Sequence, residues 1–341
     1  MAARNQGCAT ARIAPTSEHL GYREPVLRAN QAVRLGLRAA SRNPELPFAK
    51  ALIDQVGNFL AALPLALAAL LVATAASDDL LLAAEQGLRA AAVLSWPILG
   101  AIATALVIAF TAGMWFWAGA LPLLAADAEL GRRPPPGNFA MLLSRGAARA
   151  LLAGALGWGL SSLFSIVCAV AFLFGAGAAV FRSSAGLLAG AALTGAAGVL
   201  GSILLDLQAR LTLVRAAVFG DPATSAFGKA ASLFGQRAGA LLVVTAAFMF
   251  LELIVASVAT TLTAMLSGAA WLDLAPQVIA LAPRAAVALA TGAFFAWLEV
   301  GRMAALAALA ADAEGLIEPP AAPEPPPAAE LVVEAIPADE A

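Results

Sequence analysis

Six apolar stretches, each long enough to cross a bilayer, alternate with connections that carry most of the charged residues. They cover residues 52–75, 91–115, 150–173, 186–208, 239–262 and 277–300. A helix needs about 20 consecutive apolar residues to span the hydrocarbon core of a membrane. The pattern therefore predicts an all-α fold, a polytopic transmembrane helix bundle of six spans. The apolar pattern of the second and sixth stretches continues to Leu130 and Glu314, so we expect these two helices to extend beyond the bilayer.

The remaining segments divide the chain further. Residues 1–24 are polar and predict a disordered leader, and residues 315–341, rich in Pro, Ala and Glu, predict a disordered acidic tail. Between them lie a basic amphipathic segment at 25–48, which should rest at the membrane surface, and a six-span membrane domain at 49–314. The basic segment carries four arginines that we expect to contact lipid headgroups: Arg28, Arg34, Arg38 and Arg42. Its helix should end at Asn43-Pro44, because the residue before a proline disfavours helical geometry.

Composition and charge support a membrane protein and indicate its topology. The chain is 61% hydrophobic and 12% charged, whereas soluble proteins carry about 25% charged residues. Of its 20 Lys and Arg residues, 17 fall on the side that holds both termini and the 131–149 and 209–237 connections. Positive residues collect on the cytoplasmic side of membrane proteins. We therefore expect a multi-pass protein of the cell inner (cytoplasmic) membrane with both termini cytoplasmic.

One carboxylate lies near the middle of a predicted span. Glu252 is about 20 Å from the cytoplasmic edge of the fifth span, and Arg284 is about 12 Å from the opposite edge of the sixth. The two residues should therefore lie at similar depth, and we expect an intramembrane charged pair between Glu252 and Arg284. The alternatives are a protonated Glu252 and a proton or ion pathway through it, because a buried acid in a membrane usually has a partner or a function.

Other charged residues are spaced for local ion pairs along single helices. Lys50 and Asp54 are four residues apart, as are Asp206 and Arg210, and Glu299 and Arg302 are three apart.

A row of small residues marks the fourth span as a helix-packing face. It consists of Gly186, Gly190, Thr194, Gly198 and Ser202. Small residues at this spacing let helix backbones approach closely in a membrane. We expect packing within the bundle, with Gly154 and Gly157 on the opposing face; a homo-oligomer contact is the alternative.

A short internal repeat precedes the third and fifth spans. The pattern F-x4-S-x4-R recurs 88 residues apart, as Phe139, Ser144 and Arg149 and as Phe227, Ser232 and Arg237. We expect each copy on a short amphipathic helix that leads into its span. This spacing also suggests that the second and third spans, and the fourth and fifth, form duplicated hairpins.

The sequence gives little support to catalysis or cofactor binding. His19 is the one histidine and lies in the leader, and the two cysteines, Cys8 and Cys168, have no metal-ligand spacing. Nucleophile–base, metalloprotease and phosphate-binding motifs are missing, so we expect no catalytic residues, no metal and no cofactor. Basic residues interleaved with exposed aromatics are also missing, so we expect no nucleic-acid partner.

One cytoplasmic connection carries a family resemblance. The run Arg215-Ala216-Ala217-Val218-Phe219-Gly220-Asp221, continuing through Ala226 and Ser232 to Arg237, resembles a loop of uncharacterised six-helix bacterial integral membrane proteins. It is also similar to the membrane domain attached to some glycerophosphodiester phosphodiesterases. The resemblance covers residues 25–312 and implies the six-helix architecture, without implying phosphodiesterase activity.

Two functions fit these observations. The first is a non-enzymatic scaffold or accessory component of a membrane complex, which would bind a protein partner through the cytoplasmic loops and the acidic tail. The alternative is a small-molecule or ion transporter or channel that uses Glu252.

Overall fold

Seven α-helices make up the part of the chain that the computed structural model describes. Its backbone covers residues 27–75, 80–130, 139–182, 184–268 and 274–317, and its side chains cover 27–64, 96–128, 139–182, 184–266 and 282–317. The expected leader and nearly all of the expected acidic tail lie outside these residues. The helices are α1 (Ala29–Arg42), α2 (Glu45–Ala75), α3 (Leu80–Leu130), α4 (Phe139–Arg182), α5 (Ala185–Val218), α6 (Ala223–Gly268) and α7 (Leu274–Ala313).

The helix ends follow the local signals in the sequence. Helix α1 ends at Arg42, directly before Asn43-Pro44, as predicted. Helix α3 continues to Leu130, and α7 ends at Ala313, one residue from the predicted end. The expected short helices before the third and fifth spans are not separate elements, because their residues belong to α4 and α6. Helix α6 nevertheless has a non-helical residue, Arg237 (φ −129°, ψ 27°), just before the apolar stretch of the predicted fifth span.

Five of the helices are long and apolar enough to cross a membrane. They are α3, α4, α5, α6 and α7, judged over the described side chains. The first predicted span lies on α2, whose side chains are described only as far as residue 64. Helix α3 has 51 residues, which corresponds to about 75 Å at 1.5 Å per residue. It is therefore much longer than a hydrocarbon core of about 30 Å.

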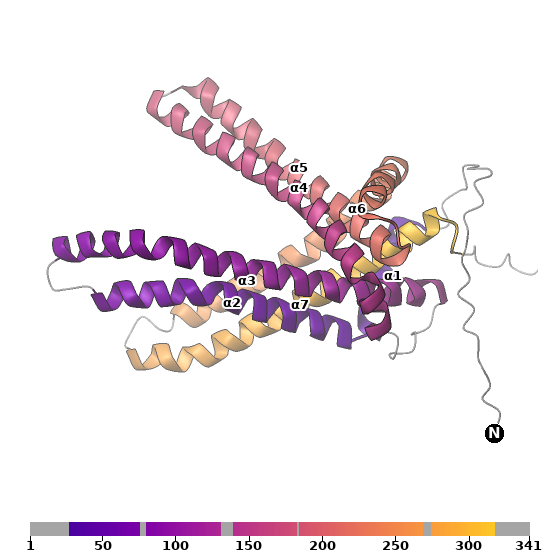
Figure 1. Cartoon of the computed structure of the whole chain (residues 1–341), viewed down its shortest axis with the longest axis horizontal. Helices are drawn as coiled ribbons and strands as arrows, with labels where there is room; N and C mark the ends of the chain where they lie inside the picture. The colour runs from indigo at the N-terminus through magenta and orange to yellow at the C-terminus, as the bar shows by residue number, and fades with distance from the viewer. Residues whose placement is uncertain (1–26, 76–79, 131–138, 183, 269–273, 318–341) are drawn as a thin grey trace, which may run out of the picture.

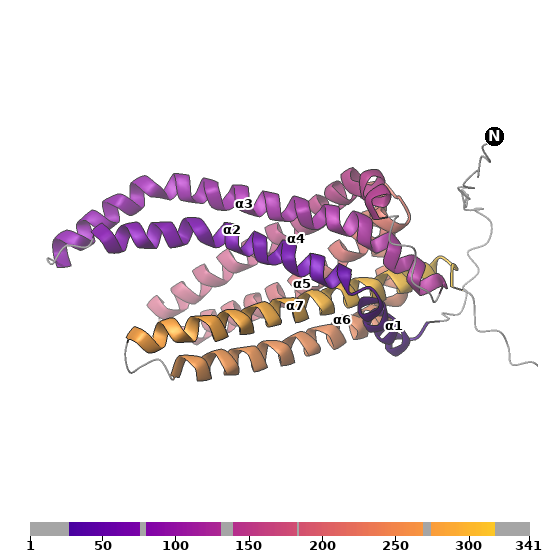
Figure 2. The same ribbon diagram turned by 90° about the horizontal axis from the view of Figure 1, so that it is seen from below.

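The long helices pair as three antiparallel hairpins, α2 with α3, α4 with α5, and α6 with α7 (Figures 1 and 2). The predicted grouping of the second with the third span, and of the fourth with the fifth, corresponds to α3–α4 and α5–α6, which also contact each other, so the proposed duplication stays a prediction. The repeated Phe-Ser-Arg pattern begins the α4–α5 and α6–α7 hairpins. In both copies the serine hydroxyl donates to the carbonyl three residues earlier, Ser144 to Met141 (2.9 Å) and Ser232 to Lys229 (2.8 Å).

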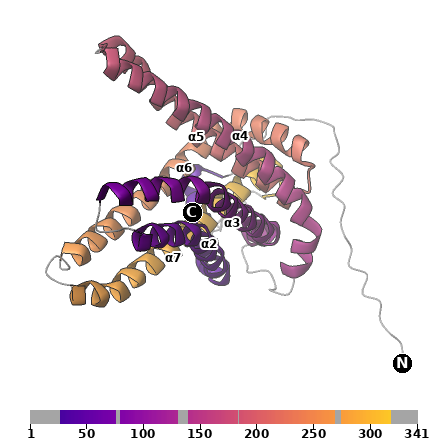
Figure 3. The same cartoon turned by 60° about the vertical axis from the view of Figure 1, so that its left-hand side comes forward.

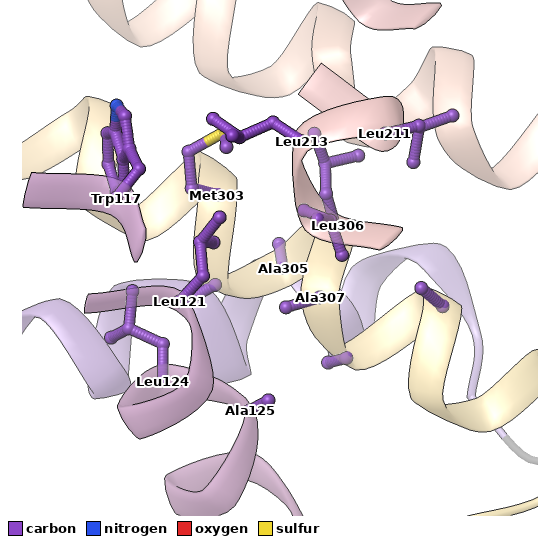
Figure 4. Close-up of a cluster of buried hydrophobic side chains, with 14 of the residues drawn as sticks. Trp117, Leu121, Leu124, Ala125, Leu211, Leu213, Met303, Ala305, Leu306 and Ala307 are labelled. Carbon is purple, nitrogen blue, oxygen red and sulfur yellow. The ribbon is translucent and has the colours of Figure 1, made fainter. Parts of the chain in front are cut away.

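The buried core lies at one end of the three hairpins. We call this end, where α1 and the last residues of α7 lie, the base (Figure 1). Its fully buried side chains come mainly from the C-terminal parts of α3, α5 and α7, which meet there (Figure 4). Leu121 and Leu124 of α3, Leu211 of α5 and Leu306 of α7 are all completely inaccessible to solvent.

The hairpins separate from each other away from the base. The α4–α5 hairpin leans away from the other two, which Figure 3 shows from a second direction. Its outer half exposes large apolar side chains, including Phe174, Phe181 and Leu193. Exposed apolar surface of this extent is expected where lipid is the solvent, and it is rare in water.

Candidate functional site

A cluster of charged side chains lies between the apolar core of the base and the separated halves of the hairpins. It joins α2, α5, α6 and α7, and we call it the charged cluster. Its members are Lys50, Asp54, Asp206, Arg210, Glu252, Glu299 and Arg302.

Glu299 is the centre of the charged cluster. Its carboxylate lies 2.8 Å from Lys50 Nζ on α2 and 3.3 Å from Arg210 Nη1 on α5. Lys50 also binds Asp54 at 2.6 Å, and Arg210 binds Asp206 at 2.7 Å. One acid on α7 therefore connects the α2–α3 and α4–α5 hairpins to the third hairpin.

Two further contacts bind the charged cluster to its surroundings. The Trp158 indole N–H on α4 donates to Asp206 at 3.0 Å. Lys50 precedes the apolar part of α2 and is 8% exposed. Burial alone would lower the pKa of its ammonium, but the Glu299 and Asp54 carboxylates outweigh this effect, so the pKa of Lys50 is raised. Lys50 therefore keeps its charge at every physiological pH.

Glu252 pairs with Arg302, and the predicted pairing with Arg284 is wrong. The Glu252 carboxylate lies 3.0 Å from Arg302 Nη2. Arg284 Nη2 instead donates to the backbone carbonyl of Leu266 at 3.4 Å. The expected mid-membrane carboxylate therefore has a cation partner, but that cation comes from the base end of α7.

The register of the α6–α7 hairpin explains the error. The aromatic ring of Phe248 lies beside Gly301, and Leu266 lies beside Arg284. In an antiparallel pair with this register, Glu252 is level with about residue 298. Side chains on a helix point toward its N-terminus. Because α6 and α7 run in opposite directions, Glu252 and Arg302 point toward each other and close the remaining gap of one helical turn.

The local ion pairs were predictable in part. The Lys50–Asp54 and Asp206–Arg210 pairs are confirmed, both at helical i, i+4 spacing. The Glu299–Arg302 pair is wrong, because Glu299 binds Lys50 and Arg210 while Arg302 binds Glu252. A signal for these long-range contacts was present in the sequence. The cation of each confirmed local pair, Lys50 or Arg210, also binds Glu299, a charged residue in the apolar part of α7.

In each hairpin the first helix runs away from the base and the second runs back to it. Near the end of the base, an arginine close to the start of the first helix binds the end of the second. We call these three contacts the base clasps. Arg42 lies 3.3 Å from Asp127 near the end of α3, and Arg237 lies 2.5 Å from Asp312 near the end of α7. Arg149 donates to the carbonyl of Gly220, just after α5, at 2.8 Å. A cation is favoured there because the C-terminal end of a helix carries partial negative charge.

The connection that carries the family resemblance forms a tight turn at the Arg149–Gly220 base clasp. Arg215, 5% exposed, binds Asp221 at 3.1 Å and also Glu314 beyond the end of α7. Gly220 has φ +72°, a conformation that favours glycine. A Cβ there would also lie 2.6 Å from the Arg149 guanidinium. The residues of this connection therefore hold α5, α6 and α7 together at the base.

The small-residue face of α5 packs only in part. Gly198 faces Cys168 on α4, and Ser202 Oγ lies 2.8 Å from Ser165 Oγ. Among the described residues, no side chain of another helix lies within 4 Å of a Cβ placed on Gly186 or Gly190, so both glycines lie outside the packed face. Thr194 donates to the carbonyl of Gly190 on its own helix.

The predicted opposing face on α4 packs elsewhere. Gly157 faces Ala209, further along α5 than the predicted row. Gly154 faces Met114 and Phe110 of α3. Neither of them therefore opposes the predicted row.

The four predicted headgroup arginines lie on or next to α1. Arg28, Arg34 and Arg38 are exposed, and Arg42 is half-buried in its base clasp. The opposite face of α1, with Ala32, Gly36, Ala39 and Ala40, is buried. Three of the four arginines are therefore available to solvent or to a membrane surface.

A scan against protein-family models and searches of curated sequences and of solved structures found no match to this chain. The family resemblance of the 215–237 connection stays a prediction. Among the described residues, no group of three or more His, Cys, Asp or Glu side chains is arranged to hold a metal ion.

Taken as chemistry, the charged cluster is suited to holding helices together. Each of its four carboxylates has a cation within 3.3 Å. Paired charges of this kind fix the register of packed helices. Removing one partner lowers the stability of the fold, because the other charge is then buried without compensation.

Proposed function

We propose that this protein is a non-enzymatic scaffold or accessory component of a complex in the inner (cytoplasmic) membrane. In this proposal α2 is the first of six spans, the base faces the cytoplasm, and the hairpins separate within the bilayer. The observation that carries the proposal is the contrast between the two ends of the molecule. The base is tightly packed and joined by ion pairs, whereas the outer halves present apolar surface that the chain itself does not cover.

The orientation rests on the distribution of charge. Arginine and lysine side chains collect at the base, including the three of the base clasps. Arg182 and Arg284 lie toward the opposite ends of the hairpins. An excess of positive residues on one side supports a cytoplasmic base and cytoplasmic termini.

The pairing of every carboxylate in the charged cluster with a cation supports the scaffold over the transporter. A transporter that used Glu252 would need this carboxylate to exchange partners during its cycle. Arg302 occupies it at 3.0 Å, and the Arg302 guanidinium also interacts electrostatically with Glu299. These contacts are suited to a fixed structural role.

The experiment compares partner recovery from native membranes for three forms of the chain. The full chain, a chain without the acidic tail (residues 316–341), and a control chain without the polar leader (residues 2–24) are each crosslinked in the membrane and purified. We expect a stoichiometric membrane-complex partner with the full chain and the control, and its loss without the tail. The proposal would be contradicted if each of the three forms were recovered without a partner protein.

The alternative function has its own test. A transporter would conduct protons or ions when reconstituted into liposomes, and Glu252→Gln would abolish that flux while Arg284→Gln would not. Under the scaffold proposal we expect none of these proteins to raise flux above that of empty liposomes.

A further inference from the structure

The elbow between α1 and α2 contains two adjoining depressions of opposite character. The first, about 400 Å³, is lined by Leu37, Arg38, Ser41 and Arg42. The second, about 460 Å³, is a trough between the elbow and α7, lined by Ala40, Ser41, Pro44, Pro47, Phe48, Ala293, Phe294 and Trp297. Ser41 lies at the border of both, so a single molecule could occupy the two together.

The first depression is basic. Arg38 is exposed and has no ion-pair or hydrogen-bond partner among the described residues. Arg42, on the other side, is held toward α3 by Asp127 at 3.3 Å. The guanidinium of Arg38 is therefore the group that can turn toward an incoming anion.

The trough is aromatic and uncovered. Phe48 is 74% exposed and Phe294 is 57% exposed, while Trp297 is half-buried beside them. Tryptophan is enriched where a membrane protein crosses from hydrocarbon to headgroups. An apolar chain lying in the trough would cover these rings.

The trough lies further from the end of the base than the crossing of α1 and α7. Helix α1 crosses α7 at Gly36 and Gly301, near the base (Figure 2). Ala293 lies about two turns before Gly301 on a helix that runs toward the base. The trough therefore lies on the side of α1 that faces the separated hairpins, whereas the basic depression is formed by α1 itself.

We propose that the α1–α2 elbow is a binding site for one anionic phospholipid of the leaflet at the base. Its phosphate group binds Arg38, and one acyl chain lies in the trough against Phe48, Phe294 and Trp297. Charge complementarity selects an anionic headgroup, and the apolar trough selects a lipid over a free phosphate. This site goes beyond general attraction of α1 to a charged surface, because it assigns different roles to arginines one turn apart.

The matched pair Arg38 and Arg34 tests the site. Both are exposed arginines on α1, but Arg38 lines the first depression and Arg34 lines neither of the two. The detergent-purified full chain is titrated with phosphatidylglycerol or phosphatidylcholine, and bound lipid is counted by native mass spectrometry. We expect one phosphatidylglycerol per chain in preference to phosphatidylcholine. Arg38→Gln should weaken its binding about fivefold, the effect of losing one arginine at an anionic headgroup, and Arg34→Gln should leave it unchanged.

A second matched pair tests the acyl chain. Phe294→Ser, in the trough, should weaken phosphatidylglycerol binding, whereas Phe59→Ser, equally exposed on α2 but outside the trough, should not. Equal losses for Arg38→Gln and Arg34→Gln would mean general surface attraction and would overturn the site. Equal retention of both lipids would also overturn it. A several-fold gain in bound phosphatidylglycerol after removal of residues 318–341 would show that the acidic tail is the occupant instead.

Discussion

Replacing Gly36 by alanine should detach α1 from α7, although alanine is the better helix former. The added Cβ would lie 2.9 Å from the Cβ of Ala305, 3.1 Å from its amide nitrogen, and closer still to the carbonyl oxygen of Gly301. These are backbone atoms and a first side-chain carbon, so none of them can turn aside. The two helices would have to move apart along a face that also buries Ala32 and Ala40 completely.

The magnitude follows from two opposing effects. Glycine to alanine in a helix interior gains about 1 kcal/mol from helix propensity. Overpacking a tight contact costs about 1–3 kcal/mol, and more where the backbone itself must shift. The clash at Gly36 involves two backbone atoms, so we expect the upper part of this range and a net loss of about 2 kcal/mol in the free energy of unfolding.

The assay is thermal unfolding of the detergent-purified full chain, together with labelling of a cysteine placed at Ala40 in a chain free of other cysteines. We expect Gly36→Ala to lower the unfolding temperature and to speed the labelling, because Ala40 is covered only while α1 is docked. Gly228→Ala is the control, since nothing lies within 4 Å of its Cβ position. It should be neutral or stabilising by up to about 1 kcal/mol. If the two variants unfold at the same temperature, the close packing of α1 on α7 is refuted.

Three further predictions concern the charged groups, and each is measured by thermal unfolding in detergent. Glu252→Gln should lower the free energy of unfolding by about 1–3 kcal/mol, because it leaves the nearly buried Arg302 without its carboxylate partner. The loss is smaller than for a fully buried pair, since Glu252 is 24% exposed. Arg284→Gln should cost less than about 1 kcal/mol, since its described contact is one long hydrogen bond, of 3.4 Å, to a carbonyl; a loss equal to that of Glu252→Gln would restore the pairing excluded above. Asp312→Asn should cost about 2–4 kcal/mol, because the nearly buried carboxylate binds Arg237 and also accepts the backbone N–H of Leu27. An unchanged unfolding temperature would mean that the Arg237–Asp312 base clasp does not hold α1 and α6 to α7.

Much of the helical architecture could be predicted from local signals. Apolar stretches marked the long helices, and Asn43-Pro44 marked the end of α1. The continued pattern to Leu130 marked the end of α3. Each of these signals acts within one helix, so a single sequence is enough to detect it.

The contacts between helices could not be predicted in the same way. The depth of Glu252 was counted from the ends of its span, but its partner depends on how far α6 and α7 slide past each other. The prediction that the whole small-residue row of α5 is packed was wrong for a related reason. Its first members, Gly186 and Gly190, lie at the outer end of α5, where α4 and α5 approach through Ala191 and Gly175 instead. Periodicity identifies a face of a helix, and the tertiary arrangement decides which part of that face is covered.

The central position of α7 has a consequence for biosynthesis. In its most apolar window 72% of the residues are buried, against 6% in α4, and its Glu299 and Arg302 neutralise charges on three earlier helices. A ribosome makes α7 after the other six described helices. During translation the first two hairpins are made with Lys50 and Arg210 still lacking their shared acid, and α6 follows with Glu252 lacking its cation. Assembly of these seven helices therefore waits for α7, and a chain that stops before α7 would present quality-control proteases with unmatched charges.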